Sequence, residues 1–194
     1  MAVHFSERYI APTNDNLYYI KNTKGGYNKC IQIQSNGSVL PNCPGYAYGR
    51  FMECQPNVHT CNLSRGQAEW WYGYRLDGYQ RGQTPKLGAV ICWHSTKSGG
   101  HVAIVEYIYP NGDIITTNSA YRGRRFYRKK LSPPNYFMGS AYTFQGFIYN
   151  PTEFEEDPTP PEPTTEVERK RFPWVLYARK LRNNRNWHNI KNIL

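Results

Sequence analysis

A cysteine and a histidine are the residues of this chain best suited to do chemistry together. Cys43 precedes a Pro-Gly turn, and the residues that follow, as far as Cys54, can form a helix. A thiol at a helix N-terminus is stabilised as a thiolate, because the helix dipole and the unpaired backbone N–H groups favour negative charge. His101 follows Gly99-Gly100 at the start of an apolar, β-branched run typical of a strand. The pattern predicts a cysteine nucleophile with a histidine base.

Two sequence motifs surround this pair. The first runs Asn42-Cys43-x-x-Tyr-Ala-Tyr-Gly-Arg50, and the second joins Gly-Ala-Val-Ile-Cys-Trp at 88–93 to Gly-His-Val-Ala-Ile-Val-Glu at 100–106. In this order they resemble the CHAP family, the cysteine, histidine-dependent amidohydrolases/peptidases of phage lysins and bacterial cell-wall hydrolases. The resemblance covers roughly residues 25–150. It implies a papain-like α+β fold, with N-terminal helices packed on an antiparallel β-sheet.

The resemblance also implies a catalytic mechanism. Cys43 would attack an amide carbon, and His101 would take the thiol proton and return it to the leaving amine. The family usually places Glu-x-Asn on the next strand to orient the imidazole, whereas this chain has Asn118 and Ala120 at those positions. We expect Asn118 to orient His101, because an amide oxygen can accept the ring N–H. Glu106 is the alternative, but its spacing from His101 points it to the opposite sheet face.

Aromatic side chains can bind the sugar rings and peptides of a polymer, and the chain has 17 Tyr and 5 Trp. The candidate substrate-binding residues are Trp70, Trp71, Trp93 and Tyr121. Tryptophans beside a small core are also ordinary packing residues, so Trp70 and Trp71 have two interpretations at this point.

The surrounding pattern predicts the elements that position these residues. Ser64 and Gln67 form a capping-box pattern that predicts a second helix over residues 64–71. Arg50 is expected to pair with a carboxylate or carbonyl group and so fix the first helix. Apolar and β-branched runs predict five strands, over residues 89–93, 102–109, 114–117, 126–131 and 142–149.

The cysteines and acids give no support to a bound metal. Five cysteines are an odd number, and their spacing fits no zinc framework, so we expect free thiols, with Cys92 in the core. A Cys54–Cys61 disulfide is conceivable, and Cys30 is a weaker rival nucleophile because no helix start follows it. Some CHAP lysins bind calcium through an Asp-rich loop before the nucleophile. Residues 21–42 contain no acid, so we predict no metal and no cofactor.

The net charge of +10 is unevenly distributed. Residues 1–150 hold 16 basic and 7 acidic side chains, residues 151–168 hold seven acids and no base, and residues 169–194 hold eight bases and no acid. The excess positive charge of residues 1–150 would favour binding to nucleic acid or to an anionic wall polymer. No nucleic-acid fold signature surrounds the basic residues, so no nucleic acid partner is expected. The basic run from Arg122 to Lys130 is either a solvated face or a site for anionic wall components.

The composition divides the chain into four parts: an N-terminal arm (1–20), a catalytic domain (21–150), an acidic Pro-rich linker (151–168) and a basic C-terminal segment with a helical pattern (169–194). The last segment could attach the protein to phage tail proteins. Neither a signal peptide nor a transmembrane segment is evident. We therefore expect the protein in a phage virion, or in the host cytoplasm with release to the wall.

These observations favour a hydrolase that cleaves an amide bond in the peptidoglycan of Gram-positive walls. Both an N-acetylmuramoyl-L-alanine amidase and an endopeptidase fit, and both a virion-associated lysin and a free endolysin fit. The altered Glu-x-Asn positions also allow a catalytically silent CHAP fold that serves as a structural or wall-binding tail protein. A basic nucleic-acid-binding module is the least supported hypothesis.

Overall fold

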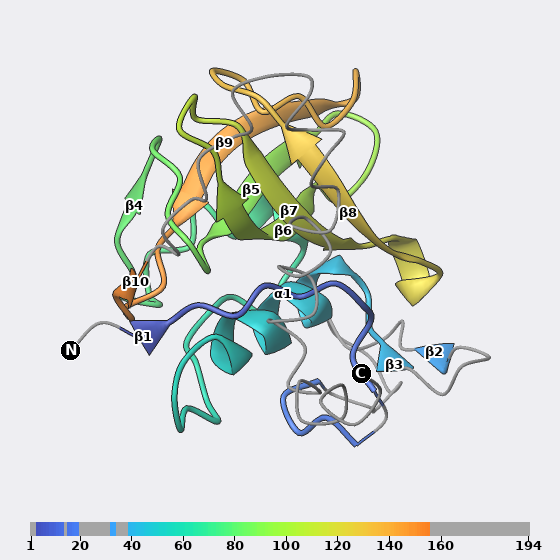
Figure 1. Ribbon diagram of the computed structural model, residues 1–194. Coiled ribbons are helices and arrows are strands. Elements are labelled where there is room, and N and C mark those ends of the chain that lie inside the picture. Colours follow the sequence, from blue (N-terminus) through green and yellow to red (C-terminus); the bar gives the residue numbers. More distant parts are fainter. Residues whose placement is uncertain (1–2, 14, 20–31, 34–38, 156–194) are drawn as a thin grey trace, which may run out of the picture. The chain divides into compact units, whose positions relative to one another are not determined.

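The computed structural model describes residues 3–13, 15–19, 32–33 and 39–155. One helix, α1 (Cys43–Glu53), lies against one side of a six-stranded antiparallel sheet (Figure 1). The strand order is β4-β9-β5-β6-β7-β8. The bounds are β4 (Arg81–Gly82), β5 (Val90–Ser95), β6 (His101–Ile108), β7 (Ile114–Ser119), β8 (Phe126–Leu131) and β9 (Tyr142–Ile148).

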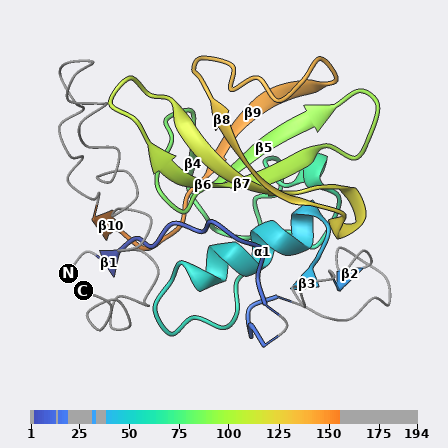
Figure 2. The same ribbon diagram turned by 45° about the vertical axis from the view of Figure 1, so that its right-hand side comes forward.

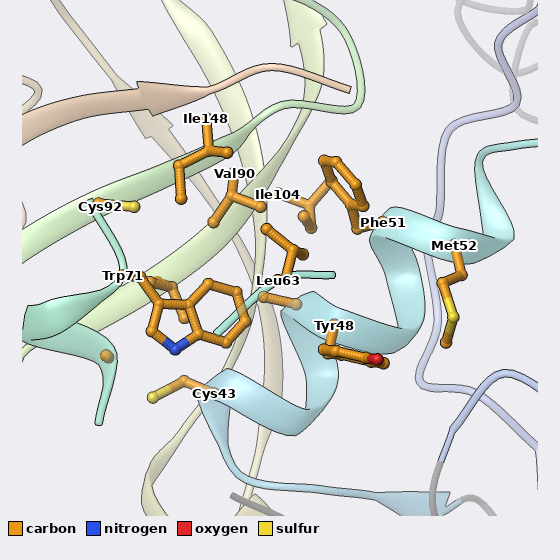
Figure 3. Close-up of a cluster of buried hydrophobic side chains, with 13 residues drawn as sticks. Cys43, Tyr48, Phe51, Met52, Leu63, Trp71, Val90, Cys92, Ile104 and Ile148 are labelled. Carbon is orange, nitrogen blue, oxygen red and sulfur yellow. The ribbon is translucent and has the colours of Figure 1, made fainter. Parts of the chain in front are cut away.

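The helix α1 begins where the sequence places a turn. Asn42 is its N-cap residue, and Pro44 lies in the first turn, where a missing N–H costs nothing. Ten consecutive residues, 43–52, are buried. Figure 3 shows Tyr48 and Phe51 of α1 with Val90, Ile104 and Ile148 of the sheet in one apolar cluster. This packing, more than helix propensity, holds the cysteine-bearing helix on the sheet.

A second apolar cluster covers the other face of the sheet. It includes Ile91 and Trp93 of β5, Ala103 and Val105 of β6, and Tyr136 from the β8–β9 connection. Strands β5 and β6 are therefore buried on both faces. This explains why they read as continuous apolar runs and do not alternate.

Four strands of two residues each complete the described part. β1 (Val3–His4) pairs in parallel with β10 (Phe154–Glu155), and β2 (Gln32–Ile33) pairs antiparallel with β3 (Val39–Leu40). Figure 2 shows β1 beside β10, so residue 3 and residue 154 lie side by side. The sequence did not predict β1, β3, β4 or β10, because two residues carry no periodicity.

The α+β layout is confirmed, and all five predicted strands are present within two residues at either end. The prediction of a second helix over residues 64–71 is wrong. Ser64 Oγ accepts from the Gly66 N–H at 3.1 Å in a local turn, and Gln67 has an extended backbone. Only a 3-10 turn forms, η2 (Ala68–Trp70).

Several sequence predictions concern residues outside the described part. The acidic linker from residue 156 onward, the basic C-terminal segment and Cys30 lie there. In the described part, no helix combines the length and the apolar character that a membrane crossing requires.

Candidate active site

His101 and Asn118 lie on neighbouring strands and are hydrogen-bonded. His101 Nε2 is 3.0 Å from Asn118 Oδ1, and both residues are buried. Asn118 Nδ2 donates to Thr116 Oγ1 at 3.0 Å, which identifies Oδ1 as the amide atom that faces the imidazole. The ring nitrogen Nε2 must then carry the proton, because the amide oxygen can only accept. Nδ1 remains as the nitrogen with a lone pair, available to accept a proton.

The surroundings of His101 keep it neutral. Its ring stacks on Trp93 with centroids 5.8 Å apart, and the ring of Tyr142 meets it edge-on at 6.2 Å. Burial lowers the pKa of His101, the bond to Asn118 raises it, and the positive charge of Lys129 lowers it, with a resulting pKa of about 4. The imidazole is therefore uncharged at pH 7 and can act as a base.

Cys43 is the first residue of α1 and is 8% exposed. Figure 3 shows its side chain at the start of the helix, beside Trp71. The pKa of Tyr127 is raised to about 12 by burial, then by the Cys43 thiol and by Tyr142. Tyr127 is the partner of Asn118 in the β7–β8 ladder. Tyr127, at the strand position opposite Asn118, thus lies within electrostatic range of the thiol.

A direct contact joins the two segments that carry Cys43 and Asn118. Ser119, the residue after Asn118, donates its hydroxyl proton to the backbone oxygen of Pro41, two residues before Cys43. The end of β7 therefore holds the segment that leads into α1. This contact fixes the segment before Cys43 relative to the end of the strand that carries Asn118.

A buried ion pair joins α1 to the histidine strand. Arg50 Nε lies 2.9 Å from Glu106 Oε1, and Arg50 Nη2 lies 2.7 Å from Glu106 Oε2. Thr117 of β7 donates to Glu106 Oε1 at 2.6 Å. The expectation that Arg50 pairs with a carboxylate is confirmed. Both oxygens of Glu106 are engaged on the face of the sheet that α1 covers, whereas His101 stacks on Trp93 in the cluster on the other face.

The N-terminal segment, described over residues 3–13 and 15–19, completes this charged core. The Arg8 backbone N–H donates to Glu106 Oε2 at 2.9 Å, and the Arg8 guanidinium pairs with Glu53 of α1. Asn16 and Tyr19 donate to Glu53 at 2.8 and 3.0 Å. Burial would raise the pKa of Glu53, but Arg50 and Arg8 together lower it to about 2. We call Arg8, Arg50, Glu53 and Glu106 the ion cluster.

Residues 33–120 match the family model of the CHAP domain. These residues form a CHAP domain. Over 99 residues it is 30% identical to the probable autolysin LDP of Staphylococcus aureus, an alignment that covers 50% of this chain and 34% of the relative. The chain thus spans about a third of the length of that curated relative. A solved structure of an N-acetylmuramoyl-L-alanine amidase from S. aureus matches 54% of the chain and 30% of its own, at 23% identity and a TM-score of 0.39.

Two of the predicted substrate-binding residues belong to the core of the CHAP domain. Trp71 and Trp93 have no exposed surface. The Trp71 indole N–H donates to the oxygen of Gly66 at 3.2 Å, and that of Trp93 to the oxygen of Tyr136 at 3.0 Å. Their prediction as substrate contacts is corrected here: both indoles are packed and hydrogen-bonded, with no face left for a ligand.

The other two, Trp70 and Tyr121, are exposed by 59% and 66%. Trp70 belongs to η2, whose Glu69 N–H donates to the oxygen of Gly99 in the loop before the histidine strand, at 2.9 Å. Tyr121 begins the 3-10 turn η3 (Tyr121–Gly123), three residues after Asn118. Each exposed aromatic ring thus lies next to a segment that leads to or from the His–Asn pair of the CHAP domain.

The remaining described cysteines of the CHAP domain, Cys54, Cys61 and Cys92, are free thiols, so the conceivable Cys54–Cys61 disulfide does not form. Burial raises the pKa of Cys54 to about 12 and raises that of Cys92 further. Neither thiol ionises near neutral pH. Within the described ranges, no three His, Cys, Asp or Glu side chains gather as they would around a metal ion.

Proposed function

We propose that this CHAP domain hydrolyses an amide bond of bacterial peptidoglycan, with Cys43 as the nucleophile and His101 as the base. One observation carries the proposal: the hydrogen bond from His101 Nε2 to Asn118 Oδ1, which leaves Nδ1 to accept a proton. The match to the CHAP domain and the likeness to an autolysin support the choice of the wall as substrate.

The reaction follows from these roles. The Cys43 sulfur attacks the carbonyl carbon as His101 Nδ1 takes the thiol proton, and Asn118 stabilises the imidazolium through its Nε2–H. We assign the backbone N–H of Cys43, at the helix start, to the oxyanion. His101 then gives its proton to the leaving amine. Water, deprotonated by the same imidazole, hydrolyses the thioester and frees the thiol.

The low pKa of His101 favours a particular order of events. An imidazole with a pKa of about 4 is neutral at pH 7, so the resting site holds a neutral base. The proton then moves during the attack, as in general-base catalysis. Trp70 and Tyr121 supply the exposed aromatic surface on which sugar or peptide groups can lie.

The test is the clearing of purified Gram-positive walls by the full chain, with the new termini identified by mass spectrometry. We expect wild type to clear, Cys43→Ala to lose all activity, and Cys61→Ala, which removes a thiol outside the site, to retain it. New termini at the lactyl amide would identify an amidase, and new termini within the peptide an endopeptidase. Equal clearing by Cys43→Ala would exclude this nucleophile.

No clearing by a folded wild type, across several wall types, would favour the catalytically silent wall-binding hypothesis. That hypothesis depends on the loss of the family's Glu-x-Asn pattern. Asn118, at the Glu position of that pattern, is nevertheless hydrogen-bonded to His101. Use in a phage virion or as a free endolysin, and attachment of residues 169–194 to a tail, remain predictions from the sequence.

A further inference from the structure

Three exposed arginines follow the strand that carries Asn118, and they form no ion pair with the described acids. Arg122, Arg124 and Arg125 are all exposed. In contrast, several other cations of the described part pair with carboxylates, namely Arg8, Arg50, Arg81, Arg128 and Lys130. We call Arg122, Arg124 and Arg125 the arginine group. Within the basic run, Arg128 and Lys130 pair with described acids and Lys129 donates to the backbone oxygen of Met138, whereas the arginine group has no such partner among the described residues.

The arginine group is fixed next to the candidate active site. The Ala120 N–H donates to the oxygen of Arg125 at 2.9 Å, which closes the β7–β8 connection, and Ser119 anchors its first end to Pro41. The Arg125 guanidinium lies 4.9 Å from the ring centroid of Tyr127, which lies opposite Asn118 in the β7–β8 ladder. The turn η3, which includes Arg122, contacts α1, the helix that begins at Cys43. The positive charges thus lie on a connection that adjoins both Asn118 and the helix of Cys43.

The first arginine has an unusual backbone. Arg122 has φ of 60°, in the left-handed region that favours glycine, and its guanidinium lies 5.4 Å from the ring centroid of Tyr121. A side chain in this region is strained, whereas a glycine would not be. Here the position carries a long cation stacked on an exposed aromatic ring. The turn therefore presents charge and a flat apolar surface together.

Guanidinium groups recognise oxyanions through paired N–H donors, and exposed charges at the rim of a site contribute to recognition and association rate. Three such groups within four residues repel one another unless an anion neutralises them. We infer that the arginine group binds the oxyanions of an anionic wall polymer while the adjacent site holds the bond to be cut. This inference rests on the proposed function for the nature of the substrate. The oxyanion can be a phosphodiester of a wall-linked polymer or a carboxylate of the peptide chains.

The test measures the binding of the full-length Cys43→Ala protein to purified walls by co-sedimentation, which needs no turnover. We expect a triple Arg122→Gln, Arg124→Gln, Arg125→Gln variant to bind about tenfold more weakly at low salt. The difference should shrink at about 1 M salt, where charges are screened within roughly 3 Å. Unchanged thermal unfolding would exclude misfolding as the cause.

The matched control removes three charges elsewhere. Arg65, Arg75 and Lys86 are also exposed and also lie over tyrosine rings, those of Tyr48, Tyr72 and Tyr149. Their triple Gln variant has the same net charge as the test variant. We expect it to bind walls like the parent protein. An equal loss of binding in both triple variants would overturn the inference, because net charge alone would then explain binding. Unchanged binding by the test variant would also overturn it.

Walls stripped of phosphate polymers by acid identify the source of the oxyanion. If the defect of the test variant disappears on stripped walls, the ligand is a phosphodiester, and if it persists, the ligand is a carboxylate of the peptidoglycan. If the test variant lost binding to duplex DNA but bound walls like its parent, the inference would be overturned, because the ligand of these arginines would then be a nucleic acid. A wild type that clears no walls, with the binding defect present, would refute the proposed hydrolase and leave this site standing.

Discussion

Arginines lie in two different environments in the described part of this protein, the ion cluster and the arginine group. Arg50 is 4% exposed and contacts Glu53, Glu106 and the backbone oxygen of Ser6. Arg122, Arg124 and Arg125 are exposed and have no described acid as partner. The same kind of side chain fixes the helix that begins at Cys43 in one place and is exposed to solvent in the other.

The difference teaches where a substitution should affect folding and where it should affect binding. Removal of one partner from a buried ion pair leaves an uncompensated charge in the core, which is costly. Removal of an exposed arginine that pairs with no described acid leaves the folded state almost unchanged. Stability and wall binding should therefore separate cleanly between the two regions.

The largest effect is expected for Glu106→Gln. The change leaves Arg50 buried without its bidentate partner and should lower the free energy of unfolding by about 3–5 kcal/mol. Urea unfolding of the full chain measures it. Glu69→Gln is the control, because Glu69 lies 3.6 Å from His94, which is itself half exposed, and should cost less than about 1 kcal/mol. A loss below about 1 kcal/mol for Glu106→Gln would contradict the structural role of the ion cluster.

The next effect is a dependence of stability on pH. The pKa of Glu53 is about 2 in the folded protein, against an ordinary value of 4.5, so the unfolded state binds more protons as the pH falls. The ionised carboxylate contributes about 3 kcal/mol above pH 4.5, and this is lost as the pH falls toward 2. Urea unfolding between about pH 6 and pH 2 should show the decline. Glu53→Gln should be less stable at neutral pH and should have a flatter profile in this range, whereas an unchanged slope would contradict the assignment.

A smaller effect is expected for Tyr19→Phe, which deletes one hydrogen bond to Glu53 from the N-terminal segment. The expected loss is about 1–2 kcal/mol in thermal or urea unfolding, since the acceptor is charged and the Tyr19 side chain is buried. Tyr9→Phe deletes a bond to Glu7 from a tyrosine that is only partly buried, and it should cost less. Equal losses would show that burial of the tyrosine does not decide the cost.

The smallest effect on stability is expected for the arginine group. Its triple Gln variant should unfold within about 0.5 kcal/mol of wild type, because the side chains are exposed. A loss of several kcal/mol would mean that these arginines support the fold, and the comparison between the two regions would fail.

Local pattern was sufficient for the parts of the fold with strong periodicity. The apolar runs predicted the central strands, and the Pro-Gly turn predicted the start of α1. These features depend on neighbouring residues, which a sequence displays directly. Asn118 was identified by the family resemblance, as the residue at the Glu position of the Glu-x-Asn pattern, and it is hydrogen-bonded to His101.

The ion cluster could not be predicted, because its members are far apart in the chain. Arg8 and Glu106 are separated by 98 positions, and no local pattern pairs a basic residue with a distant acid. The capping-box pattern at Ser64 failed for a related reason: the Glu69 N–H bonds to Gly99 from another segment. Aromatic composition likewise did not distinguish the buried Trp71 from the exposed Trp70.

The parallel pairing of β1 with β10 has a practical consequence. Val3 is the register partner of Phe154, so the first and last described strands of this body lie beside each other. A short connection can bridge two such neighbouring ends, which makes the CHAP domain a suitable unit for circular permutation or for insertion into a loop of another protein. New ends could open at Asn111-Gly112, the turn between β6 and β7, so that His101 and Asn118 would stay on strands that pair through their own ladder.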